Sequence, residues 1–176
     1  MRRTAFDLGK TFTITIVMLI LPFIVGIINI GTVVDYKLGV ATFKHAAPTF
    51  IFFTAWAFML YKSRSQLIPL FISLLYWGIC SVGAAYIANV TFSLSSANSS
   101  EAANKGIISV FDNILLPVYG HCVFFDEPDR AFYYSCSVIS ALFTAASVYL
   151  IVRWFVIYSK EKRMGIVYNR HGELVK

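Results

Sequence analysis

The residue types that bind metals or perform acid–base catalysis are scarce in this chain and far apart. Its three histidines fall in three different polar segments: His45, His121 and His171. No two of them have the spacing of a metal site on one helix, and no two can form a buried pair of haem ligands. The chain also lacks the G-x-S-x-G, H-E-x-x-H and phosphate-loop motifs. We therefore expect a protein that is not an enzyme and that binds no metal or cofactor.

Acidic groups inside the apolar stretches are equally rare. Asp112 is the only carboxylate there, and proton or ion pathways across a membrane usually need such a group near the membrane centre. We interpret Asp112 as a solvated residue of an interfacial helix, which argues against a transporter or a channel. The cysteines form no C-x-x-C pair, which argues against a thiol oxidoreductase: Cys80, Cys122 and Cys136.

The composition predicts the kind of scaffold that positions these residues. Of 176 residues, 58% are hydrophobic and only 14% are charged, which is the balance of a membrane protein with a single domain. The formal net charge of +6 does not indicate nucleic-acid binding, because the basic residues lie at the ends of apolar runs and not among aromatic residues on one face. Membrane lipid with anionic headgroups is the expected partner of such residues.

Four apolar runs predict an all-α membrane protein, a bundle of four transmembrane helices: residues 11–30, 44–61, 67–88 and 131–158. The second and third runs are joined only by the polar turn 62–66, so they must lie side by side and antiparallel. The second helix begins either near Val40 or with Pro48 in its first turn, where the missing N–H of proline costs nothing. The first run is too long for a signal peptide and no A-x-A-like site follows it, so we expect a retained anchor.

The distribution of charge predicts the orientation of this bundle. With both termini and the turn 62–66 on one side, that side holds eleven of the fifteen Lys and Arg residues and three of the nine acidic residues. Because basic loops stay on the inner side, both termini are predicted to be cytoplasmic, including the tail 159–176. Residues 89–130 then form an outer loop, with an apolar interfacial or re-entrant segment at 107–125.

The outer side has two features that each allow two interpretations. Cys122 and Cys136 both lie there, and they either form a disulfide in an oxidising compartment or remain free thiols. Acidic residues surround Pro128: Asp126, Glu127 and Asp129. These acids either attract a cationic partner that approaches from outside or form a solvated turn in front of a helix N-terminus.

Small residues recur at four-residue spacing in the third and fourth runs. The residues concerned are Cys80, Ser81, Ala84, Ala85 and Ala88 in the third run and Ser137, Ala141 and Ala145 in the fourth. Such spacing lets helix backbones approach closely in lipid, where burial of apolar surface gives no drive for association. The stripes indicate packing inside the bundle in preference to a surface for a partner helix.

Five short motifs follow one another in an order that resembles a known family. They are Leu21-Pro22, Lys44-His45-Ala46-Ala47-Pro48, Tyr61-Lys62-Ser63-Arg64, Trp77-Gly78 and Phe92-Ser93-Leu94-Ser95-Ser96-Ala97. Across about residues 21–97 and the basic end of the last helix, the chain resembles the immunity proteins against pore-forming toxins of the colicin A and colicin B type. It departs from them in a shorter first outer loop, a longer interval from Lys44 to Pro48 and an insertion at 107–129. The toxin that it would recognise therefore stays open.

The resemblance implies a four-span protein of the bacterial inner membrane that protects the cell producing the toxin. Such proteins are not enzymes; they meet the transmembrane hairpin of the toxin within the membrane and block channel opening. The expected partner-binding residues are Ser81, Ala85, Ser137, Ala141 and Ala145 within the membrane, with Asp126, Glu127 and Asp129 outside. If this helix face carries recognition, Ala141→Leu should abolish protection. The alternative is an accessory subunit of a larger secretion, conjugation or respiratory complex, with the stripes facing permanent neighbours.

Overall fold

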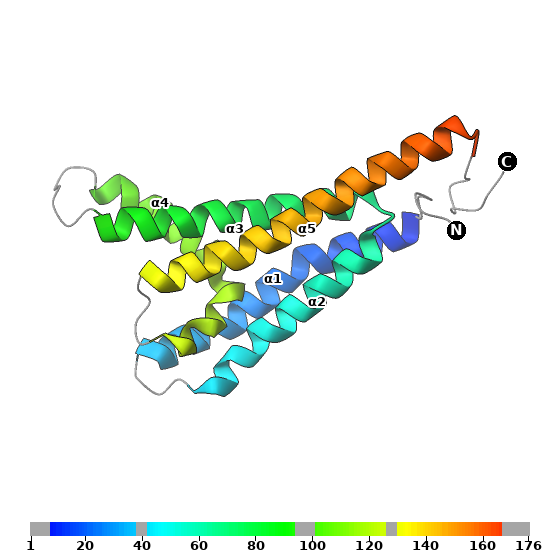
Figure 1. The fold of residues 1–176 in the computed structure, drawn as a ribbon. Coiled ribbons are helices and arrows are strands. Elements are labelled where there is room, and N and C mark those ends of the chain that lie inside the picture. Colours follow the sequence, from blue (N-terminus) through cyan, green and yellow to red (C-terminus); the bar gives the residue numbers. More distant parts are fainter. Residues whose placement is uncertain (1–7, 38–41, 94–100, 126–129, 167–176) are drawn as a thin grey trace.

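The structure, a computed structural model, describes residues 8–37, 42–93, 101–125 and 130–166, and every regular element within these ranges is a helix (Figure 1). The α-helices are α1 (Leu8–Lys37), α2 (Ala47–Ser63), α3 (Leu67–Ser93), α4 (Glu101–Leu115) and α5 (Arg130–Arg163). Two 3-10 helices accompany them: η1 (Phe43–Ala46) leads directly into α2, and η2 (Leu116–Phe124) continues α4. The predicted all-helical fold is confirmed.

Four stretches of the described chain are long and apolar enough to cross a membrane: Leu8–Asp35, Leu67–Val90, Lys105–Phe124 and Arg130–Arg163. The chain is thus a helical transmembrane protein with several passes. Three of these stretches contain the predicted spans 11–30, 67–88 and 131–158. The fourth stretch, Lys105–Phe124, was expected to be only an interfacial or re-entrant segment, and its path is described below.

The helix α2 is shorter than a complete membrane span. Its 17 residues rise only about 25 Å, against about 30 Å for a hydrocarbon core. The four residues of η1 precede it without a break, so helical backbone runs from residue 43 to residue 63 and covers the predicted span 44–61. Pro48 lies in the first turn of α2, which is the second of the two predicted starting points.

Three features of the chain meet at one end of the bundle (Figure 1). They are the first turn of α1, the last turn of α5, and the tight turn between α2 and α3, in which Gln66 donates its N–H to the carbonyl of Ser63. We call this end the turn end and the opposite end the loop end. The predicted connection of the second and third runs by a tight turn is therefore present, as α2 and α3, but the two helices diverge from that turn and do not lie side by side along their length (Figure 1).

The most extensive helix pairing is that of α3 with α5, and small residues make it possible. Cys80, Ala84 and Ala88 of α3 are completely buried. Ser81 Oγ donates to the carbonyl of Ser137 at 3.2 Å, and Ser137 Oγ donates to the carbonyl of Ser81 at 3.0 Å. Such reciprocal bonds require two backbones in close approach, which only small side chains permit. Packing inside the bundle is confirmed for this part of the two stripes.

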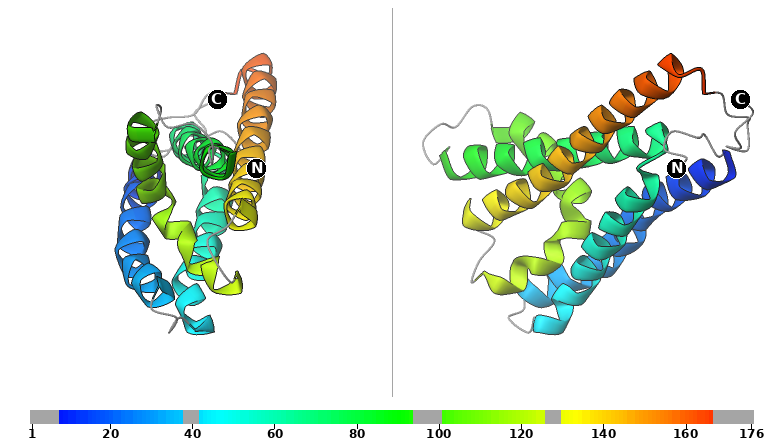
Figure 2. Two further views of the ribbon diagram at one scale, coloured as in Figure 1. Left: turned by 90° about the vertical axis from the view of Figure 1, so that its left-hand side faces the viewer. Right: turned by 45° about the vertical axis from the view of Figure 1, so that its right-hand side comes forward.

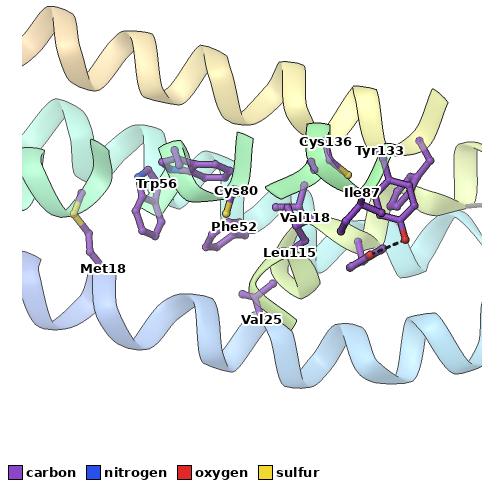
Figure 3. Packing of buried hydrophobic residues seen from close by; sticks show 14 of the residues in the cluster. Met18, Val25, Phe52, Trp56, Cys80, Ile87, Leu115, Val118, Tyr133 and Cys136 are labelled. Carbon is purple, nitrogen blue, oxygen red and sulfur yellow. Dashed lines mark hydrogen bonds between the residues drawn. The ribbon is translucent and has the colours of Figure 1, made fainter. Parts of the chain in front are cut away.

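Aromatic and hydroxyl side chains join α2, α3 and α5 in the core, where side chains from all the long helices converge (Figure 3). The buried ring of Trp77 stacks on Phe143 of α5, with 4.4 Å between the ring centroids. Trp56 of α2 donates its Nε1–H to Ser73 Oγ of α3 at 2.9 Å, and Ser73 Oγ lies 2.9 Å from Ser147 Oγ of α5. This chain of bonds satisfies polar groups that lipid cannot satisfy.

The segment formed by α4 and η2 enters the bundle and leaves it at the same end. In the second half of α4, Phe111 packs against Tyr86 of α3, with 5.9 Å between the centroids. Farther along, Ile114 reaches Tyr76 of α3, and Phe124 then contacts Phe43 of η1 and Phe50 of α2 at the loop end. Figure 2 shows this segment bending back between the pair α1–α2 and the pair α3–α5.

This path favours the second of the two descriptions expected for residues 107–125, interfacial or re-entrant. Leu115 and residues 117–122 are buried among the helices, so the segment does not lie on the surface of the bundle. The predicted outer loop 89–130 is correspondingly mostly helical, because α3 continues to Ser93 and α4 begins at Glu101. The backbone changes from α to 3-10 geometry at Leu116–Pro117, since proline has no N–H to continue the α-helical pattern.

A lipid-facing groove as the candidate binding site

An apolar groove of about 500 Å³ lies between α1 and α3. The re-entrant segment forms its floor through Ile114, Leu116 and Pro117. The rims carry large apolar side chains that are at least 46% exposed: Leu19, Phe23, Ile27 and Ile30 of α1 and Ile79 of α3. Because these rims belong to stretches that can cross a membrane, the groove opens sideways toward lipid.

The lining of the groove is almost entirely apolar. Only Asn113 and Tyr76 among its residues have a polar side chain. The amide of Asn113 donates to the carbonyl of Ser109 at 2.8 Å, and the hydroxyl of Tyr76 faces the carbonyl of Ile114 at 3.5 Å. A hollow of this volume and polarity suits a binding partner made of hydrocarbon, namely a lipid chain or the side chains of another apolar helix.

Polar side chains of α1 and α2 hold the floor of the groove in place. Asn29 is fully buried, and its Nδ2 donates to the carbonyls of Leu116 at 2.8 Å and Pro117 at 3.1 Å. Thr49 Oγ1 donates to the carbonyl of Pro117 at 2.8 Å and accepts the N–H of Gly120 at 3.0 Å. These bonds satisfy backbone groups that the change to 3-10 geometry frees inside the membrane. Neither Asn29 nor Thr49 was among the functional residues expected from the sequence.

The structure does not bring the predicted partner-binding residues together on one surface. Ser81 and Ser137 bond each other inside the α3–α5 interface, and Ala85 is half-buried. Ala141 and Ala145 are exposed on the outer face of α5. The three predicted acidic residues lie outside the described residues: Asp126, Glu127 and Asp129. Of the predicted residues that the structure describes, none lines the groove.

A second polar cluster surrounds Asp112, which was expected to be solvated. This carboxylate is half-buried and accepts hydrogen bonds from the hydroxyl of Tyr119 and, at 3.4 Å, from the hydroxyl of Tyr133. Neither tyrosine was singled out from the sequence. The two tyrosines belong to η2 and α5, so the cluster ties the returning half of the re-entrant segment to the loop end of α5.

Two of the three histidines, His45 and His121, have structural partners, and His171 lies outside the described residues. His45 accepts the N–H of Thr42 at Nδ1, and its Nε2 lies 3.0 Å from Asp35 Oδ2. His121 Nε2 lies 2.8 Å from Ser135 Oγ and 3.8 Å from Cys136 Sγ. Cys122 and Cys136 are both buried free thiols, the second of the two predicted alternatives. Within the described ranges, no group of three His, Cys, Asp or Glu side chains has the geometry of a metal site.

No family model, curated protein or solved structure matches this chain. The interpretation of the groove therefore depends on its own geometry and on the motifs in the sequence.

Proposed function

We propose that this chain is an immunity protein of the bacterial inner membrane that binds the transmembrane hairpin of a colicin-type pore-forming toxin and keeps its channel closed. The observation that carries the proposal is the groove between α1 and α3, an apolar hollow that opens toward lipid. The order of motifs from Leu21-Pro22 to Phe92-Ser93 is the reason for proposing this family. The groove is the surface to which we propose that the toxin hairpin binds.

The physics of helix association in lipid favours such a surface. Lipid tails are as apolar as leucine, so two helices gain little from hydrophobic burial alone and depend on close packing. Mobile acyl chains fill a concave groove poorly, whereas the fixed side chains of an apolar helix can fill it closely. A toxin helix seated between Phe23 of α1 and Ile79 of α3 would be held beside this protein and kept out of the channel.

The proposal is tested by potassium efflux from toxin-sensitive bacteria that express this chain. Cells are challenged with a panel of pore-forming colicins that includes the A and B types, with membrane insertion of the chain verified in each culture. We expect protection against one toxin and not against its relatives. An absence of protection across the panel would contradict the proposal and favour the accessory-subunit hypothesis, whose test is stoichiometric co-purification with fixed partners.

A pair of matched variants links protection to the groove. Ile79→Trp places a bulky ring in the groove, while Ile68→Trp places the same ring at a similarly exposed position of α3 outside it. We expect Ile79→Trp to lose protection and Ile68→Trp to retain it, with both variants inserted in the membrane. Equal protection by the two variants would remove the groove from the recognition surface.

A further inference from the structure

A second hollow lies between α1 and α2 at the turn end and is distinct from the groove. It has a volume of about 310 Å³ and is lined by Lys10, Thr13 and Ile14 of α1 and by Phe58, Met59 and Lys62 of α2. It therefore combines an apolar floor with two ammonium groups. The proposed toxin site has no basic lining residue, so this hollow serves a different ligand.

We propose that this hollow is a binding site for one anionic phospholipid, with the phosphate between Lys10 and Lys62 and an acyl chain along Ile14, Phe58 and Met59. Both lysines lie one turn or less from the ends of their helices, which places their charges at the level of lipid headgroups. The apolar residues lie deeper along the same two helices. The phosphate of the lipid thus contacts the basic part of the site, and its acyl chain contacts the apolar part.

The ammonium group of Lys62 lies against the aromatic lining of the hollow. Its Nζ lies 5.3 Å from the centroid of the Phe58 ring, so the side chain folds back along α2 toward the hollow. The ring then supports the ammonium group on one side and forms part of the apolar lining on the other. An ammonium held in this way is available to a phosphate that enters from the membrane surface.

The start of α1 also favours an anion. The first turn of a helix carries partial positive charge, which attracts anions. Lys10 lies in the first described turn of α1 and lines the hollow. Charge complementarity therefore selects an anionic lipid over a zwitterionic one.

The test measures lipid retention by native mass spectrometry after the full chain is transferred from vesicles of phosphatidylglycerol and phosphatidylcholine into detergent. We expect one phosphatidylglycerol molecule to be retained. K10Q/K62Q should lower the preference for phosphatidylglycerol by about thirtyfold, or about 2 kcal/mol, the usual gain from two basic residues at an anionic surface. K160Q/K162Q removes two lysines at the same end outside the hollow and should leave the preference unchanged.

A second pair of variants tests the apolar half of the site. Thr13→Trp fills the hollow. Thr54→Trp on α2 is the matched control, because Thr54 lies outside the hollow. Both threonines are exposed, and each donates a hydrogen bond of 2.9 Å to the carbonyl four residues earlier. We expect only Thr13→Trp to lose the retained lipid. Retention by K10Q/K62Q equal to that of the unmodified chain, or an equal loss in K160Q/K162Q, would overturn the proposal. Both results are independent of protection against toxin.

Discussion

Thr49 is the residue on which the contacts of η2 converge. Its Oγ1 accepts hydrogen bonds from Asn29 Nδ2 at 2.9 Å and from the N–H of Gly120 at 3.0 Å, and it donates to the carbonyl of Pro117. One hydroxyl thus joins α1, α2 and the re-entrant segment inside the membrane. The floor of the groove keeps its position because of this small set of bonds.

Gly120→Ala tests this arrangement at the scale of one methyl group. A Cβ at residue 120 would lie 2.5 Å from Thr49 Oγ1 and 2.9 Å from the carbonyl oxygen of His45, and neither neighbour is the end of a flexible side chain. We expect the free energy of unfolding, measured by titration of the micelle-bound protein with dodecyl sulfate, to fall by about 1–3 kcal/mol.

Gly106→Ala is the matched control, because a Cβ there meets nothing within 4 Å. It lies in α4, so replacing glycine with alanine should raise stability by about 0.5–1 kcal/mol. We expect the two substitutions to change the free energy of unfolding in opposite directions. If Gly120→Ala lowers it by no more than the amount by which Gly106→Ala changes it, the contacts described for η2 are contradicted.

The cluster around Asp112 shows why single residues were hard to predict from sequence. Its partners Tyr119 and Tyr133 lie seven and twenty-one positions farther along the chain. Both separations are multiples of seven, the spacing of one helix face, but the three residues belong to three different elements, α4, η2 and α5. The pairing exists only because η2 returns beside the start of α5, and nothing local in the sequence specifies that return. Asn29 is a similar case, since its partner carbonyls are 87 and 88 residues away.

At the scale of helices, the sequence-based hypothesis assigns part of the partner-binding surface to α5, at Ala141 and Ala145. Both residues are exposed and lie about one turn apart. The groove lies between α1 and α3 and has no residue from α5. The two surfaces therefore make opposite predictions for substitutions on α5.

Ala141→Leu separates these surfaces. If the groove binds the toxin, a larger side chain on α5 leaves protection unchanged in the efflux assay, as Ala57→Leu does on the exposed face of α2. Loss of protection in Ala141→Leu alone, with normal membrane insertion, would move recognition to α5. It would support the original expectation that small residues on this helix meet the toxin.

Helices that span the membrane were predicted well because length and hydropathy alone define them. Residues 11–30, 67–88 and 131–158 are apolar runs of 20 residues or more, and each lies within one observed helix. The re-entrant segment could not be placed in the same way. Its depth is decided by hydrogen bonds from Asn29 and Thr49 to its backbone, and its apolar composition is shared by interfacial helices.

The whole molecule combines a basic turn end with a re-entrant segment at the loop end. Described basic residues gather at the turn end: Lys10, Lys62, Arg64, Lys160, Lys162 and Arg163. This arrangement agrees with the charge pattern from which we infer cytoplasmic termini. The proposed lipid site lies at the turn end of α1, and the proposed toxin site begins one turn farther along the same helix, at Met18, and extends toward the loop end.

Recognition through the groove is tested most directly by photo-crosslinking in cells under toxin challenge. Benzoylphenylalanine replaces Phe23, a rim residue of the groove that is 74% exposed, or Phe12, an equally aromatic residue of α1 that is 65% exposed and lies outside the groove. We expect a crosslinked adduct between this chain and the toxin from position 23 and none from position 12. Protected cells that give no adduct at position 23, or equal adducts at both positions, would contradict binding in the groove.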